Sequence, residues 1–267
     1  IGIEHYAHVT PLPNAANDAR ALADLLREDH GFEITLILDA EATGDKLRAE
    51  FQDLGKRLSK GDRLLVYFAG HGIARDGDWG FLVPHDSESN KIESLLSMED
   101  LRRWLSGLPC RHLLVLLDCC FAGTFQWSGK ISRQRTRGVT LYREQYRRWV
   151  DNRAHQVITS AAFNQEALDS ILIEDCEYKL GSRGAAIAEH SPFAYALLQV
   201  LGHPDDTGIE PLDTQSGLIT APALSGILQR TVVRLTGGKQ HPQTFTLDEF
   251  DVGEYLFQLP GSSLILD

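Results

Sequence analysis

The sequence predicts an α/β fold, with a mostly parallel sheet of about six strands between helices on both faces, in three layers. Two runs, residues 62–69 and 111–118, are almost continuously apolar, as strands buried on both faces are. Around them, apolar residues recur at helical spacing. Regular alternation of strands and helices is typical of a parallel sheet covered on both sides.

Five helices are predicted from this spacing, over residues 14–28, 43–58, 97–105, 191–201 and 220–235. Thr43 is suited to cap the second helix, and Ser97 with Asp100 resembles a capping box for the third. Pro192 suits the first turn of the fourth. Beside the two apolar runs, shorter strands are expected at residues 32–38, 79–83, 156–160 and 255–259.

The composition argues against several classes of protein. The chain has 267 residues, of which 43% are hydrophobic and 24% charged, as in soluble globular proteins. It contains no apolar run of about 18 residues, so we expect no membrane span. The net charge of −11 argues against direct nucleic-acid binding. Four cysteines are too few for a disulfide scaffold, so we expect a reducing, cytoplasmic setting.

One segment departs from the alternating pattern. Residues 128–153 contain eight basic and two acidic side chains. We interpret the segment as a long exposed connection, helical near residues 141–150, and a plain solvated loop is the alternative. Loops of this length are usually functional or mobile. We therefore expect one domain over 1–267, with this connection (128–154) between a first part (1–127) and a second part (155–267).

Two chemically reactive side chains follow the two apolar runs. His71 comes after the first and Cys120 after the second, and reactive groups gather at the carboxyl ends of parallel strands. A thiol beside an imidazole can form a nucleophile and base pair. The backbone N–H groups of Gly72 and Cys120 are suited to hold an oxyanion. The alternative is that the histidine is structural and the cysteine is a small buried hydrophobe.

Local strings support the catalytic interpretation. The two strand ends read "YFAGHG" and "DCCFAG", with His71 lying 49 residues before Cys120. These strings resemble the histidine and cysteine motifs of caspase-like cysteine peptidases, and most closely those of the metacaspase and bacterial branch. Three further strings resemble the same branch, so that the resemblance covers nearly the whole chain: "LPNAANDA" (12–19), "VITSAA" (157–162) and "SPFAYALLQVL" (191–201).

The resemblance implies a role for each matching residue. Cys120 matches the nucleophile and His71 the catalytic histidine, while the N–H groups of Gly72 and Cys120 match the oxyanion donors. Cys119 stands where the branch has serine, so it is the less favoured nucleophile. The implied activity is that of a cysteine endopeptidase, with a role in bacterial stress, defence or cell-death signalling.

The resemblance also implies a specificity pocket. Asp18 and Asp118 match two acids that line the primary pocket in the metacaspase branch, and Ala69 leaves room for a side chain to pass. Ser160, in the 157–162 string, is assigned to the same pocket. Two carboxylates in one cleft repel each other and favour a cationic side chain, so we predict cleavage after Arg or Lys. The alternative is that Asp18 caps the first helix and Asp118 binds backbone N–H groups.

The substrate prediction bears on the basic segment. An enzyme that cuts after basic residues can cut itself within residues 128–153, and we predict such processing. The alternative is that the segment covers the acidic cleft as an inhibitor. Phe121 and Ala122 replace the branch's usual His-Ser, which leaves the detailed specificity open.

Competing functions have weaker support. A catalytically silent interaction or signalling module with this fold is the main alternative, although both His71 and Cys120 are present. The sequence contains neither a phosphate-binding glycine motif nor a G-x-S-x-G string. A zinc site is disfavoured because the cysteines lack C-x-x-C spacing: Cys110, Cys119, Cys120 and Cys176.

We expect no cofactor. Some metacaspases require calcium, but no calcium-binding arrangement can be defended for the candidate acids Asp86, Glu174, Asp175 and Glu177. The expected partner is a protein or peptide substrate with Arg or Lys at the cleavage site. Because bacterial relatives often carry a sensor domain, we also expect a regulatory domain or an activating partner.

Overall fold

The computed structural model has a central sheet in the order β1-β5-β6-β8. Strands β1 (Arg63–Ala69), β5 (His112–Asp118) and β6 (Ala154–Thr159) run parallel, and β8 (Gln243–Thr246) runs antiparallel to β6. The predicted fold class is confirmed. The structure describes residues 1–75, 79–88, 91–120, 143–162, 167–169, 189–202, 217–248 and 251–260.

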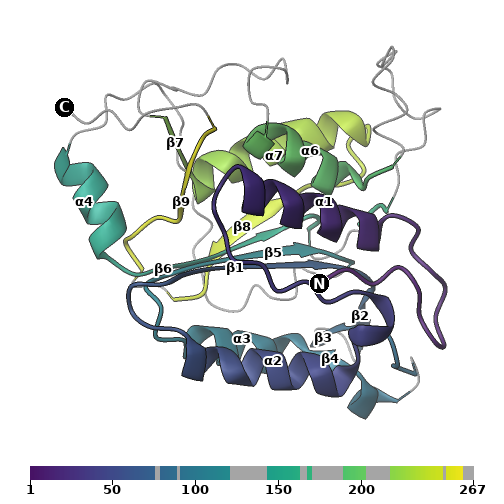
Figure 1. The fold of residues 1–267 in the computed structure, drawn as a ribbon. Helices are drawn as coiled ribbons and strands as arrows, with labels where there is room; N and C mark the ends of the chain where they lie inside the picture. Colours follow the sequence, from purple (N-terminus) through teal and green to yellow (C-terminus); the bar gives the residue numbers. More distant parts are fainter. Residues whose placement is uncertain are drawn as a thin grey trace.

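Helices cover both faces of this sheet (Figure 1). On one face lie α1 (Ala15–Glu28), α6 (Pro192–Gly202) and α7 (Ala221–Leu235), and on the other lie α2 (Gly44–Arg57) and α3 (Met98–Ser106). Helix α4 (Arg143–Asp151) lies at one end of the sheet. No helix in the described ranges is both long enough and apolar enough to cross a membrane.

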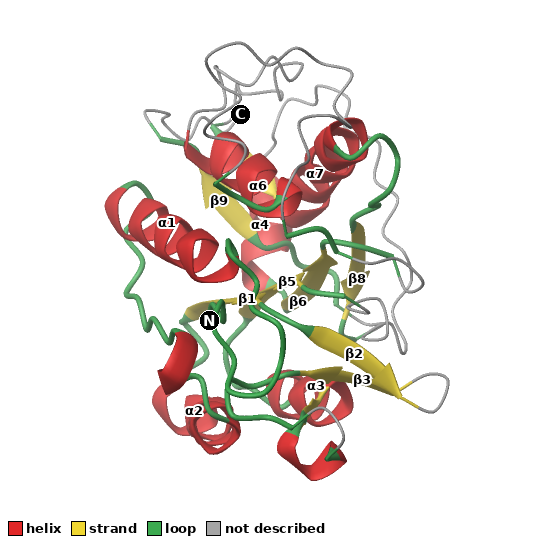
Figure 2. Cartoon of the chain, turned by 90° about the vertical axis from the view of Figure 1, so that its right-hand side faces the viewer, coloured by secondary structure: helices red, strands yellow, loops and turns green. Residues whose placement is uncertain are grey.

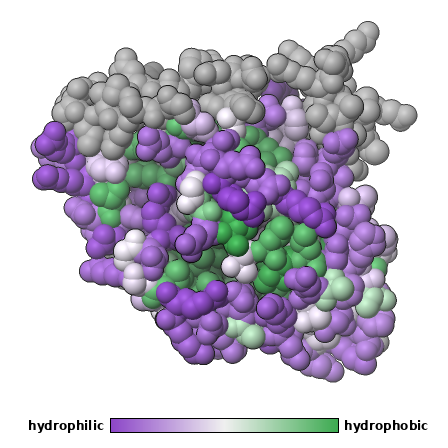
Figure 3. All heavy atoms as spheres, in the orientation of Figure 1, coloured by the Kyte–Doolittle hydropathy of each residue, from purple (hydrophilic) through white to green (hydrophobic). Residues whose placement is uncertain are grey.

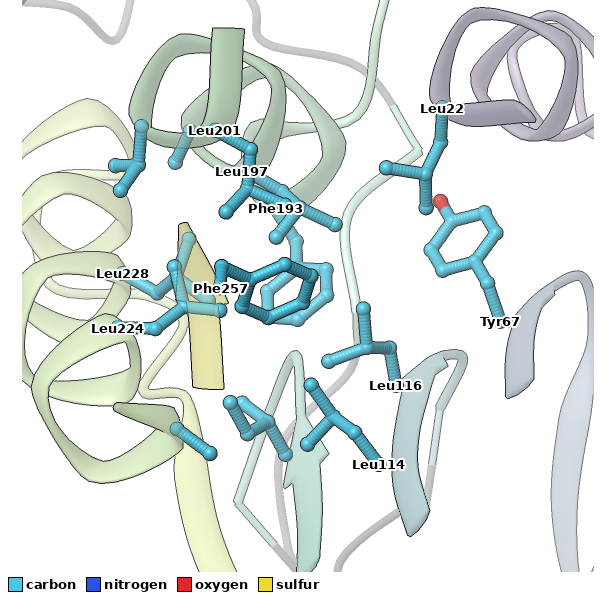
Figure 4. Packing of buried hydrophobic residues seen from close by; sticks show 14 of the residues in the cluster. Leu22, Tyr67, Leu114, Leu116, Phe193, Leu197, Leu201, Leu224, Leu228 and Phe257 are labelled. Carbon is cyan, nitrogen blue, oxygen red and sulfur yellow. The ribbon is translucent and has the colours of Figure 1, made fainter. Parts of the chain in front are cut away.

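Strand β5 is apolar from Leu113 to Leu117 because both of its faces are covered. Leu114 and Leu116 pack toward α6 and α7, while Leu113, Val115 and Leu117 pack toward α2 and α3, as the two-residue period of a strand requires. Figure 4 shows Leu114 and Leu116 on the sheet side of the cluster that contains Phe193 and Leu197 of α6, and Tyr67 of β1 beside Leu22 of α1. Each such large buried side chain contributes roughly 1.5–3 kcal/mol.

The predicted helix caps are confirmed. The hydroxyl of Thr43 accepts a hydrogen bond from the N–H of Lys46 at the start of α2. At the start of α3, Ser97 accepts from the N–H groups of Glu99 and Asp100. Thr220 caps α7 in the same way. Such caps stabilise a helix by about 1 kcal/mol each.

Two small antiparallel sheets flank the central one. Strands β2 (Gly72–Arg75), β3 (Trp79–Leu82) and β4 (Leu96–Ser97) form the first, and the β2–β3 hairpin projects beyond the central sheet (Figure 2). Strands β7 (Leu218–Thr220) and β9 (Leu256–Gln258) form the second. Short 3-10 helices occupy Asp39–Glu41 and Ile92–Ser94. The hairpin starts one residue after His71, so it belongs to the surroundings of the site.

The edge of the sheet beside β1 differs from the prediction. Residues 32–38 were expected to form a buried strand. Among the described residues, their one link to the sheet is a bridge from Leu38 to Gly2, which in turn bridges Ala69. Their side chains alternate between exposed and partly buried up to Leu36, because only one side of the segment packs on the core.

On the face drawn in Figure 3, hydrophobic side chains show mainly in the middle, and hydrophilic ones cover most of the lower rim.

Candidate active site

The pairing of β1 with β5 brings His71 and Cys120 to the same edge of the sheet. Ala69 lies directly opposite Asp118 in the parallel register, and the N–H of Gly70 donates to the carbonyl of Asp118 at 3.3 Å. His71 and Cys120 each lie two residues beyond this pair. They therefore occupy equivalent positions past the carboxyl ends of adjacent strands, where α/β proteins place their reactive groups.

Strand alternation separates the two adjacent cysteines. Cys119 is 2% exposed and continues the apolar face that packs toward α2 and α3. Burial raises the pKa of its thiol well above the ordinary range. Cys120 is partly exposed, and its Sγ donates to the carbonyl of Ala167 at 3.8 Å. Of the two, Cys120 has the accessibility that a nucleophilic thiol needs.

The imidazole of His71 is held by the loop of residues 4–14, here called the N-terminal loop. Its Nε2 lies 2.7 Å from the carbonyl of Thr10, which assigns the proton of the neutral ring to Nε2 and leaves Nδ1 as the acceptor. Tyr6 packs against the ring, with centroids 4.9 Å apart, and its hydroxyl accepts from the backbone N–H of His71 at 2.7 Å. Neither Tyr6 nor Thr10 was predicted from the sequence.

Gly72 lies against the backbone of Cys120. A Cβ atom at position 72 would be 2.1 Å from the carbonyl oxygen of Cys120 and 3.3 Å from Sγ of Cys119. This approach leaves no room for a side chain. The two predicted oxyanion donors, the N–H groups of Gly72 and Cys120, therefore belong to backbone segments in direct contact.

Two acids predicted for the pocket lie together beside this edge. Asp18 of α1 is 1% exposed, and its Oδ2 accepts from the backbone N–H of Ser191 at 3.1 Å. Asp118 accepts from the Ser191 hydroxyl at 2.6 Å and more weakly from the Tyr67 hydroxyl at 3.4 Å. His190 reaches the other oxygen of Asp18, with Nδ1 2.6 Å from Oδ1. Asp18 thus binds the start of α6 rather than capping its own helix.

Asp169 is a third acid, which was not predicted. Its carboxylate accepts from the backbone N–H of Asn14 at 3.2 Å, and its carbonyl accepts from the Asn14 side chain at 2.6 Å. It lies two residues after Ala167, which contacts Cys120. The only available sequence signal was an acid following the third parallel strand, β6, whose carboxyl end meets the same edge.

The charge of Asp18 disfavours the ionisation of both Asp118 and Asp169. Burial, followed by the charge of Asp18 and that of Asp169, raises the pKa of Asp118 to about 7, although the Ser191 hydrogen bond opposes the shift. Burial and the charge of Asp18 raise the pKa of Asp169 to about 6. Burial also raises the pKa of Asp18, against the hydrogen bonds from His190 and Ser191. Without a bound cation, this pocket holds protons near neutral pH.

The two remaining pocket predictions also lie at this edge. Ala69 is 2% exposed and faces the same side of the sheet as Tyr67. Ser160 is fully buried, and its N–H donates to the carbonyl of Leu117 at 2.9 Å. Its buried hydroxyl has no hydrogen-bond partner among the described residues.

Some predictions concern residues outside the described ranges: Phe121, Ala122, most of the basic segment, Glu174, Asp175, Cys176 and Glu177. Asp86, the remaining calcium candidate, accepts from the N–H of Gly44 at 2.8 Å. Within the part of the chain that is described, no three His, Cys, Asp or Glu side chains are grouped to hold a metal ion. The cofactor expectation remains a prediction.

Comparison with known proteins shows the family to which the chain belongs. Residues 1–248 match the model of the caspase domain. Metacaspase-4 of Arabidopsis thaliana is 30% identical over 142 residues, which are 46% of this chain and 32% of that protein, so the chain spans about a third of the length of this curated relative. The crystal structure of protein GSU0716 from Geobacter sulfurreducens shares the fold, with a TM-score of 0.58 and 19% identity over 99% of this chain and 97% of that one. The chain therefore belongs to the caspase-domain family of cysteine peptidases.

Proposed function

We propose that this chain is a cysteine endopeptidase that cleaves proteins after Arg or Lys. The observation that supports the specificity is a group of three acids, the buried Asp18 and Asp118 and the half-buried Asp169, here called the acidic pocket. Burying carboxylates without a counter-charge is costly, and a guanidinium or ammonium group would offset that cost. Arg is slightly favoured because its planar fork can bind two carboxylates at once.

The proposed mechanism assigns each step of the reaction to a group at this edge of the sheet. His71 Nδ1 accepts the proton of the Cys120 thiol, and the thiolate attacks the scissile carbonyl carbon. The N–H groups of Gly72 and Cys120 stabilise the resulting oxyanion. The imidazolium then protonates the leaving amine, which leaves an acyl-enzyme on Cys120. Water, deprotonated by His71, hydrolyses the thioester and restores the thiol.

Fluorogenic peptides that differ only at the residue before the cut bond test this proposal. We expect kcat/KM to be at least about 100-fold higher for Arg than for Asp, because a substrate aspartate adds a like charge to the pocket. Asp18→Asn should lower kcat/KM for Arg, whereas Asp24→Asn, an exposed position on the same helix, should not. Cys120→Ala should abolish cleavage. Preferred cleavage after Asp, or an active Cys120→Ala protein, would contradict the proposal.

We also propose that the enzyme processes itself within residues 128–153, where eight basic side chains supply cleavage sites. Incubated wild-type protein should give two fragments whose new termini, identified by mass spectrometry, follow Arg or Lys, and Cys120→Ala should stay intact. Cleavage in stress, defence or death signalling, under a sensor domain or activating partner, is the setting that the family resemblance implies. An intact wild-type chain that cleaves added peptides would refute self-processing alone.

A further inference from the structure

His190 contacts the acidic pocket without belonging to the proposed catalytic pair. Its Nδ1 donates to Oδ1 of Asp18 at 2.6 Å, and the two side chains are 17% and 1% exposed. The N–H of Ser191 holds the second oxygen of Asp18 at 3.1 Å. At this distance, protonation of the His190 imidazole would neutralise the charge of the buried Asp18 carboxylate.

The other two acids have neutral partners. Asp118 accepts from the hydroxyls of Ser191 and Tyr67, and Asp169 accepts from the N–H of Asn14. Among the residues whose positions are described, the contact between His190 and Asp18 is the only ion pair recorded for any of the three acids. Within the described part of the chain, His190 is therefore the one basic side chain that pairs with an acid of the acidic pocket.

We propose that His190 is the internal counter-ion of the acidic pocket, and that its protonated imidazolium competes with the substrate's cationic side chain for Asp18. This inference rests on the proposed specificity for Arg or Lys. A neutral imidazole still donates a hydrogen bond to Asp18 but leaves the negative charge available. An imidazolium neutralises that charge and repels a second cation in the same cleft.

The surroundings of His190 contain further groups that titrate. Protonation of the pocket carboxyls also weakens cation binding as the pH falls, so a pH profile of the wild type alone does not isolate His190. The test must therefore compare variants at each pH. In the ranges that the structure describes, these titratable groups are Asp18 on α1, Asp118 at the end of β5, Asp169, Tyr67 on β1 and Glu4, which acts on Asp169.

The decisive measurement is the ratio of kcat/KM between His190→Gln and the wild type, from pH 5.5 to 8.5, with an Arg peptide. Glutamine can donate to Asp18 but carries no charge. We expect a ratio of about fivefold in favour of the variant at the acidic end, falling to about one at the alkaline end. His30→Gln is the matched control, because His30 contacts the carbonyl of Leu201, away from the pocket, and its ratio should stay near one.

A ratio that does not change with pH would overturn the proposal, since it would mean that His190 only holds Asp18 in place. A ratio below one at acidic pH would also overturn it. Binding of a peptide amide ending in Arg to Cys120→Ala, with and without His190→Gln, should show the same dependence by calorimetry without turnover. His190→Asn replaces His190→Gln if the latter does not fold.

The two proposals fail in different ways. If the wild type does not prefer Arg or Lys, the proposed specificity is wrong, and the inference about His190 falls with it. If the wild type prefers Arg but the ratio is independent of pH, only the role of His190 is refuted.

Discussion

The hydroxyl of Tyr6 accepts a hydrogen bond from the backbone N–H of His71 at 2.7 Å, while its ring packs 4.9 Å from the imidazole. The same hydroxyl would lie 2.8 Å from a Cβ atom at Gly70. Burial raises the pKa of Tyr6, so the hydroxyl stays neutral. One residue of the N-terminal loop thus fixes both the backbone and the ring of the proposed base.

Tyr6→Phe should lower kcat about tenfold with little change in KM, because it removes the acceptor for the His71 N–H while the ring contact remains. Steady-state kinetics with an Arg peptide would measure both constants. Tyr255→Phe, on the far side of the core, should leave both unchanged. A larger effect of Tyr6→Phe on KM than on kcat would argue that Tyr6 shapes substrate binding instead.

Gly72→Ala should reduce kcat/KM by at least about 100-fold, because its Cβ atom would displace the Cys120 backbone and one proposed oxyanion donor with it. Gly55→Ala is the matched control: it lies in α2 with no atom within 4 Å of the new Cβ. That change should raise the free energy of unfolding by about 1 kcal/mol and leave activity unaltered. An active Gly72→Ala enzyme would contradict the proposed oxyanion site.

Asp118→Asn should stabilise the protein at pH 7.5. The folded state raises the pKa of Asp118 to about 7, from 3.8, so between about pH 4 and 7 the folded protein binds more protons than the unfolded chain. The free energy of unfolding therefore falls as the pH rises through this window. The variant should gain about 4 kcal/mol at pH 7.5 and almost nothing near pH 4, and its calorimetric Tm should rise accordingly. A lower Tm at pH 7.5 would contradict this assignment.

Binding of a cationic peptide should release protons. A guanidinium beside the acidic pocket favours the carboxylates, which lowers the pKa values that burial had raised. Calorimetry of Cys120→Ala with a peptide amide ending in Arg, in two buffers of different ionisation enthalpy, should show release of about one proton at pH 6.5 and almost none at pH 8.5. Proton uptake would mean that the peptide binds elsewhere.

The strands that could be predicted from the sequence are those whose hydrophobic pattern reflects how their faces are buried. Strands β1 and β5 are apolar on both faces, so their identity and their strand ends were evident. Strand β8 was missed because "QTFT" is mostly polar and lies antiparallel at the edge of the sheet. Residues 32–38 have the alternation of a strand, but they pair only at Leu38, because a hydrophobic pattern does not specify a hydrogen-bonded neighbour.

The site was predictable only where a short string identified it. His71, Cys120, Asp18 and Asp118 lie in strings that resemble a known family. Asp169 lies outside those strings, and its position follows from the path of the chain after β6. Tyr6, Thr10 and His190 act through contacts across 61 to 172 residues of sequence, a distance over which residue spacing carries no information.

The ladder between β5 and β6 has a practical consequence for handling the protein. It runs from His112 opposite Ala154 to Leu117 opposite Thr159. A chain break within residues 128–142 would remove none of these paired residues. A clipped enzyme would therefore migrate as one particle on a sizing column, and only denaturing electrophoresis would reveal two polypeptides. Nicked and intact material would co-purify, so the catalytic rate of any preparation is an average over both until the nick is quantified.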